Sequence, residues 1–209
     1  MVASNSLLAL LEGLIRLAIF LLYIVLITAM KDIRRVYMYH GAEHKCINCI
    51  EHGRILDVKN VKISSRYHKR CGTSFLLFVM VVSIILFFFI RVEQPAMRLG
   101  LRILLIPVIA GISYEIIRLA GKSDFFLVKI LSAPGMWLQR LTTKEPDEAM
   151  IEVAIAAVES VFDWKAYLQK EFDFDVDAYR DLQNYEAQQE AAAAAESEEA
   201  YDEDEEEEA

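Results

Sequence analysis

The sequence predicts an all-α membrane protein with about three transmembrane helices, an interfacial helix, cytosolic C-terminal helices and a disordered acidic tail. Hydrophobic residues make up 55% of its 209 residues, a high fraction for a soluble protein. Three apolar stretches are long enough to span a bilayer, and basic residues gather beside one end of them. We therefore divide the chain into a membrane domain over residues 7–143, a cytosolic helical segment over 144–190 and the tail over 191–209.

The three apolar stretches differ in how charges and helix breakers interrupt them. The first covers residues 7–30 and contains two charged residues, Glu12 and Arg16. As a helix it would be about 36 Å long, enough to cross a hydrocarbon core of roughly 30 Å. The second, 74–90, is uninterrupted, and the third, 101–120, contains helix breakers in its middle. The short connection between the last two predicts an antiparallel hairpin.

The distribution of Lys and Arg predicts the orientation in the cell membrane. Residues 31–73 contain ten Lys or Arg residues, whereas residues 91–102 contain three. Basic loops stay in the cytoplasm, so we expect the 31–73 loop and the C-terminus to be cytoplasmic and the N-terminus to lie outside. The alternative is a soluble protein with buried core helices. Three apolar runs combined with this charge asymmetry disfavour it.

The C-terminal part predicts helices outside the bilayer. Residues 125–141 are apolar but interrupted by Lys129 and by residues 133–135, which favours an interfacial helix over a fourth span. A cytosolic helix should follow Pro146, since Pro and acidic residues suit a first helical turn. Ten acidic and no basic residues lie in 196–208, which predicts a disordered tail, with a solubilising role favoured over a binding role. The expected partners are the lipid bilayer and a membrane protein or a second copy of the chain; no nucleic acid is expected.

All four histidines and all three cysteines lie between residues 40 and 71. Imidazole and thiolate groups are the side chains that bind zinc-like metals. If the first membrane helix continues to Gly53, His40 and His44 share one face, about 40° apart, and Glu43 lies beside them. This His-x-x-Glu-His pattern is the inverted form of a zinc protease motif, in which the glutamate activates a water molecule. Glu43 is therefore the candidate catalytic base.

The same helical geometry separates the other candidates. Cys46 and Cys49 would point away from His40 and His44, so we favour packing for them over metal binding or redox chemistry. His68 and Cys71 precede the second span and lie at the same membrane depth as the first histidine pair. The predicted metal ligands, for a divalent metal with zinc expected, are His40, His44, His68 and Cys71. The alternative is a basic patch at residues 66–70 that contacts lipid headgroups.

Glu115 is a separate candidate near the end of the third stretch. An acidic residue inside a membrane span marks a functional site by default, here as a further ligand or as a hydrogen-bond partner of a ligating histidine. Pairing with Arg118 or Arg102 explains it equally well, and both interpretations stay open.

Four motifs also give the chain a family resemblance. They are YHGAEHK (39–45), HKRCGTSF (68–75), IAGISYEIIR (109–118) and APGMWLQRLTT (133–143). The chain resembles, over about residues 7–162, the YqhQ-like family of bacterial multi-pass membrane proteins of uncharacterised function, described as predicted metal-dependent enzymes. The resemblance implies that the pattern includes His40, Glu43, His44, His68, Cys71 and Glu115. Family members usually carry a further N-terminal region, so it also implies a fragment or a shortened member.

These observations lead to two hypotheses of function. The first is a membrane-embedded, metal-dependent enzyme of hydrolytic type, with its metal site at the cytosolic face. Four protein ligands would close a tetrahedral site, so His68 or Cys71 would have to leave the ligand set for catalysis. The second is a non-catalytic membrane scaffold or assembly factor in which the same residues form a structural zinc clamp. A transporter built around Pro107, Gly111 and Glu115 is disfavoured, because three spans make a small pathway.

Overall fold

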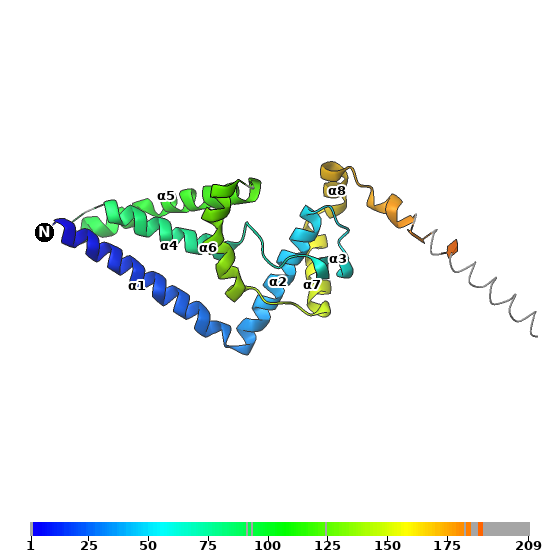
Figure 1. Ribbon diagram of the computed structural model, residues 1–209, viewed down its shortest axis with the longest axis horizontal. Coiled ribbons are helices and arrows are strands. Elements are labelled where there is room, and N and C mark those ends of the chain that lie inside the picture. The colour runs from blue at the N-terminus through cyan, green and yellow to red at the C-terminus, as the bar shows by residue number, and fades with distance from the viewer. Residues whose placement is uncertain are drawn as a thin grey trace, which may run out of the picture.

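The computed structural model of the protein describes residues 2–90, 92, 94–123, 125–181, 183–184 and 188–189. It consists of helices, and the described residues form no strand. The predicted disordered tail over 191–209 lies outside the described residues. The helices, shown in Figure 1, are α1 (Val2–Thr28), α2 (Lys31–Glu51), α3 (Val58–Ile63), α4 (Gly72–Phe89), α5 (Pro95–Lys122), α6 (Phe126–Thr142), α7 (Glu148–Val161) and α8 (Trp164–Phe172).

Three of these helices are long and apolar enough to cross a membrane, which confirms the predicted fold class. The apolar segments are Leu10–Thr28 in α1, the whole of α4 and the whole of α5. Only 11% to 22% of the most apolar window of each helix is buried inside the protein, as expected for helices that face lipid. The helix α4 packs against both α1 and α5, so the second and third spans form the predicted hairpin.

One prediction about this region is wrong: the first span does not continue as a single helix to Gly53. The helix α1 ends at Thr28, and Met30 adopts extended backbone angles before α2 begins at Lys31. Figure 1 shows a sharp bend between the two helices. The break falls where the apolar span meets charged residues, because α1 packs on α4 while α2 packs on α3 and α7. The helical register of residues 40–51, on which the site prediction depends, is preserved.

Outside the three apolar spans, an apolar core holds α2, α3, α7 and α8 together. Its buried side chains include Cys46, Cys49, Ile151 and Leu168. Burial of the two cysteines raises their pKa values, to about 12 for Cys46 and about 11 for Cys49. Both thiols are buried in this core and lie outside the group of possible metal ligands, in line with the packing role that the helical geometry favours.

The helix α6 links the last apolar helix, α5, to α7 in the chain. It packs against α4 and α5, and in Figure 1 its axis lies across theirs. A Cβ atom at Gly135 would lie 2.8 Å from the Cβ of Ser74, so glycine allows α6 to approach the first turn of α4 closely. This contact brings the C-terminal end of α6 next to the start of α4, where the candidate site lies.

Candidate metal centre

Two histidines of α2 and the residue before α4 form the candidate metal centre. The ligand atoms of His40, His44 and Cys71 all lie within 4.8 Å of one another. His40 Nε2 and Cys71 Sγ are 3.4 Å apart. His44 and Cys71 are buried and His40 is partly buried, so the three groups converge in a site with little exposure to solvent.

Backbone carbonyls orient both imidazole rings. His40 Nδ1 donates to the carbonyl oxygen of Thr142 at 2.9 Å, and His44 Nδ1 donates to that of Arg66 at 2.8 Å. A carbonyl oxygen can only accept, so each Nδ1 carries a proton and Nε2 is the nitrogen of each ring left for a metal. Histidines that ligate metals are held in this way by a partner on the opposite nitrogen. The rings are therefore arranged as metal ligands.

The spacing of one pair of donor atoms is compatible with a shared zinc ion. Zn–N bonds of about 2.05 Å and a Zn–S bond of about 2.3 Å at a tetrahedral angle place the two donor atoms about 3.5 Å apart. The observed separation of 3.4 Å between His40 Nε2 and Cys71 Sγ is close to this value. Imidazole and thiolate donors suit zinc or another transition metal and do not suit Mg²⁺ or Ca²⁺, which take oxygen ligands.

The surroundings of Cys71 favour its thiolate form. Burial raises the pKa of this thiol, but hydrogen bonds with His40, His44 and Thr73 outweigh burial and lower the pKa from 9.0 to about 5. Cys71 also stands at the N-cap of α4, where the helix dipole favours a negative charge. The hydrogen bond with Cys71 raises the pKa of His40 in turn, so the two shifts describe one imidazolium–thiolate pair. The thiolate is the form of cysteine that binds zinc.

The polar face of α2 holds the connection between α3 and α4. Lys45 Nζ donates to the carbonyl oxygens of Lys62 and Ser64, and Asn48 Nδ2 donates to those of Ser65 and Tyr67. Together with the bond from His44, these contacts fix most carbonyl groups between residues 62 and 67. The loop that carries Cys71 is thereby held against α2, although it has no secondary structure of its own.

Gly41 provides the other contact that shapes the site. A Cβ atom at this position would collide with the carbonyl oxygen of Lys144, so only glycine allows the chain after α6 to cross α2 here. The Lys144 amide donates to the carbonyl oxygen of Tyr37 at 2.9 Å and fixes the crossing. This crossing places the Thr142 carbonyl beside His40. Glycine destabilises a helix interior relative to alanine, but at position 41 it allows the contact that positions His40.

His68, the fourth predicted ligand, lies beside this group and is not part of it. Its Nε2 atom lies 3.1 Å from a carboxylate oxygen of Glu51, and its ring centroid lies 5.7 Å from that of His44. The buried side chain of Gln139 holds its backbone on both sides: His68 N donates to Gln139 Oε1 and Gln139 Nε2 donates to His68 O, each at 2.8 Å. Gln139 Nε2 also donates to Ser74 Oγ at 2.9 Å.

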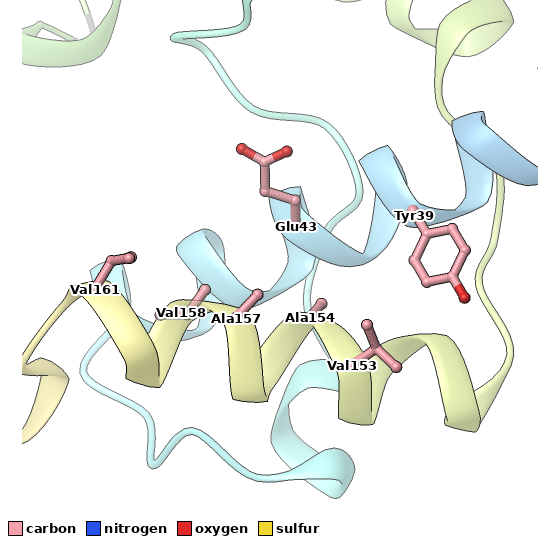
Figure 2. A pocket seen from close by; sticks show the side chains of 7 residues that line it. All are labelled: Tyr39, Glu43, Val153, Ala154, Ala157, Val158 and Val161. Carbon is pink, nitrogen blue, oxygen red and sulfur yellow. The ribbon is translucent and has the colours of Figure 1, made fainter.

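Glu43 and Glu115 lie outside the group as well. Glu43 is exposed, and its charge is one of the causes that raise the pKa of His40. It lines a groove of about 340 Å³ between α2 and α7, together with Tyr39 and five aliphatic residues of α7 (Val153, Ala154, Ala157, Val158 and Val161). Figure 2 shows its carboxylate directed away from the α7 backbone. Glu115 makes an exposed ion pair with Arg118 at 2.6 Å, one of the two interpretations left open by the sequence.

Sequence reasoning missed the residues that orient the ligands. Thr142 and Gln139 belong to α6, and both lie within the APGMWLQRLTT motif of the resemblance. A buried glutamine in a largely apolar helix needs hydrogen-bond partners, which is the signal that could have identified Gln139. No sequence pattern pointed to Glu51, because its partner, His68, lies 17 positions later in a loop.

Comparison with known proteins places the chain in a family. Residues 1–164 match the profile of the family described as protein of unknown function (DUF1385). The chain belongs to this family. It is 44% identical over 145 residues to the uncharacterised protein YqhQ of Bacillus subtilis (strain 168), which confirms the resemblance. The alignment covers 69% of this chain and 46% of the Bacillus protein, so the chain corresponds to about half of that relative. No solved structure matches.

Proposed function

We propose that the protein is a membrane-embedded, metal-dependent enzyme of hydrolytic type, with His40, His44 and Cys71 holding one zinc ion. The observation that carries this proposal is the orientation of both imidazole rings by the Thr142 and Arg66 carbonyls, which leaves Nε2 of each ring as the nitrogen available to a metal beside Cys71. Three protein ligands are the number found in catalytic zinc sites, where the fourth position is open.

The residues around the metal site would have separate roles. Zinc bound there would supply Lewis acidity and would acidify a water molecule at the open position. Glu43, one helical position before His44, is the candidate acceptor for a proton, as in the inverted zinc protease motif. Glu43 also lines the apolar groove of Figure 2, which suggests a substrate with an aliphatic part. The loop contacts of Lys45 and Asn48 keep the ligands in place.

We further propose that this site faces the cytoplasm. The basic region 31–73 contains the metal centre, and basic loops are retained on the cytoplasmic side. The C-terminal helices α7 and α8 pack with α2 and α3 in one core, so they would lie on the same side. The bilayer is the proposed environment of α1, α4 and α5.

The proposal is tested by comparing metal content with function in cells. Glu43→Gln should retain zinc and fail to complement a strain that lacks the gene. His44→Ala should lose zinc, whereas His52→Ala is a matched control on the same helix, since His52 Nδ1 bonds the carbonyl of Asn48 and lies outside the group. Full complementation by Glu43→Gln, or unchanged zinc content in His44→Ala, would contradict the proposal.

The second candidate is a non-catalytic scaffold with a structural zinc clamp. One observation favours it. The group of His40, His44 and Cys71 joins α2, which packs in the core with α3, α7 and α8, to the start of α4, a candidate membrane span. Under this function Glu43→Gln should behave like the parent, and His44→Ala should reduce the amount of protein in the membrane. The two variants together therefore separate the enzyme from the scaffold.

A further inference from the structure

Among the described residues, one buried side-chain nitrogen beside the candidate metal centre has no hydrogen-bond partner. His68 is 6% exposed, and its Nδ1 atom is buried without a hydrogen bond within the described part of the chain. A buried, unpaired polar atom is costly, about 1–3 kcal/mol, and calls for an explanation by a ligand or a water molecule. The His68 ring lies 5.7 Å from the His44 ring, measured between centroids, so this atom belongs to a side chain next to the proposed metal ligands.

The other nitrogen of this ring is held firmly. Glu51 accepts the Nε2–H of His68 at 3.1 Å, and the second carboxylate oxygen of Glu51 pairs with Arg70. A carboxylate can only accept, so Nε2 carries a proton, and whenever the ring is neutral Nδ1 is its hydrogen-bond acceptor. Gln139 fixes the His68 backbone on both sides. The contacts of Glu51 and Gln139 therefore fix the orientation of the His68 ring and its backbone, and Nδ1 is left as the nitrogen without a partner among the described residues.

The free acceptor does not belong to the ligand set itself. The donor atoms of a tetrahedral zinc site lie roughly 3.3–3.8 Å apart. His68 is not among the three residues whose ligand atoms fall within 4.8 Å of one another. It is too far from at least one of them to be a fourth ligand, yet it lies in contact with His44. The His68 ring therefore lies beside the ligand set rather than within it.

We propose that His68 and Glu51 form a positioning pair beside the open position of the metal centre. His68 Nδ1 accepts a hydrogen bond from the molecule that binds there, and Glu51 keeps the ring in the required tautomer and orientation. The pair selects occupants that carry an N–H or O–H group at the open position. This inference rests on the proposed metal site and adds a preference for hydrogen-bond donors to it.

Two small probes that bind zinc and cobalt test this preference. Methanesulfonamide keeps an N–H group when its anion binds a metal, whereas azide has no hydrogen. The full chain is purified in detergent and loaded with Co²⁺, and the cobalt absorption reports the binding of each probe. His68→Ala should keep its cobalt and lose roughly tenfold in methanesulfonamide affinity, with azide affinity unchanged.

Glu51→Ala should produce a smaller loss with the same selectivity, and it keeps the test valid if His68→Ala fails to fold. Glu148→Ala is the matched control, because Glu148 makes an exposed ion pair with Lys62 away from the site. Equal losses for both probes, no loss for either, or release of cobalt by His68→Ala would overturn the inference. A parent protein that takes up neither zinc nor cobalt would instead overturn the proposed function on which it rests.

Discussion

His40 Nε2 and Cys71 Sγ lie 3.4 Å apart, although 31 residues separate them in the chain. One residue comes from the middle of α2 and the other from the cap of α4. Their proximity depends on the loop between them, which α2 holds through Lys45 and Asn48. The candidate metal centre is therefore a product of this loop contact as much as of the ligands themselves.

The titration of Cys71 gives a first prediction. Its pKa is lowered from 9.0 to about 5, so Cys71 is a thiolate in the folded protein at neutral pH and a thiol in the unfolded chain. The contribution of this group to stability should rise between about pH 5 and pH 9 and be lost as the pH falls through about 5. The thiolate absorbance of the metal-free protein should titrate near pH 5 and should vanish in Cys71→Ser. A titration midpoint near 9 would contradict the imidazolium–thiolate pair.

The crossing at Gly41 gives a second prediction. Gly41→Ala places a methyl group against the Lys144 carbonyl and should reduce stability by about 1–3 kcal/mol. Zinc affinity should fall as well, because the displaced segment carries the Thr142 carbonyl that orients His40. Gly111→Ala is the control, since no neighbour lies within 4 Å and the helix gains propensity. Thermal unfolding in detergent and zinc titration measure both effects; equal behaviour of the two variants would contradict this role.

Gln139 gives a third prediction. Gln139→Leu preserves the approximate volume but leaves the His68 amide, its carbonyl and Ser74 without a partner. The expected loss is about 2–4 kcal/mol, because buried polar groups remain unpaired. Gln169→Leu, at an exposed position of α8, should be close to neutral. Melting temperatures of the two variants decide the point, and a neutral Gln139→Leu would show that the contact is dispensable.

The orientation in the membrane gives a fourth prediction. Cysteines introduced at Gln94, before α5, should react with an impermeant maleimide in intact cells. A cysteine at Lys59, in α3, should react only after the membrane is opened. The three native cysteines are buried and give a low background. Labelling of Lys59→Cys in intact cells would place the metal centre outside.

The sequence predicted the parts of this structure that depend on local patterns. Apolar runs identified α1, α4 and α5, and the helical spacing of His40 and His44 placed their rings on one face. The break at Met30 was missed, because it reflects the packing of α2 on α7 rather than a breaker residue. Residues far apart in the sequence, such as His68 with Glu51, form contacts that no local pattern encodes.

X-ray absorption spectroscopy of the purified, zinc-loaded protein tests the central claim most directly. We predict one sulfur ligand at about 2.3 Å and two imidazole nitrogens at about 2.0–2.1 Å, with the sulfur lost in Cys71→Ser. Two or more sulfur ligands would point to Cys46 and Cys49 instead. A shell without sulfur, or a protein that binds no metal, would contradict a metal centre formed by His40, His44 and Cys71.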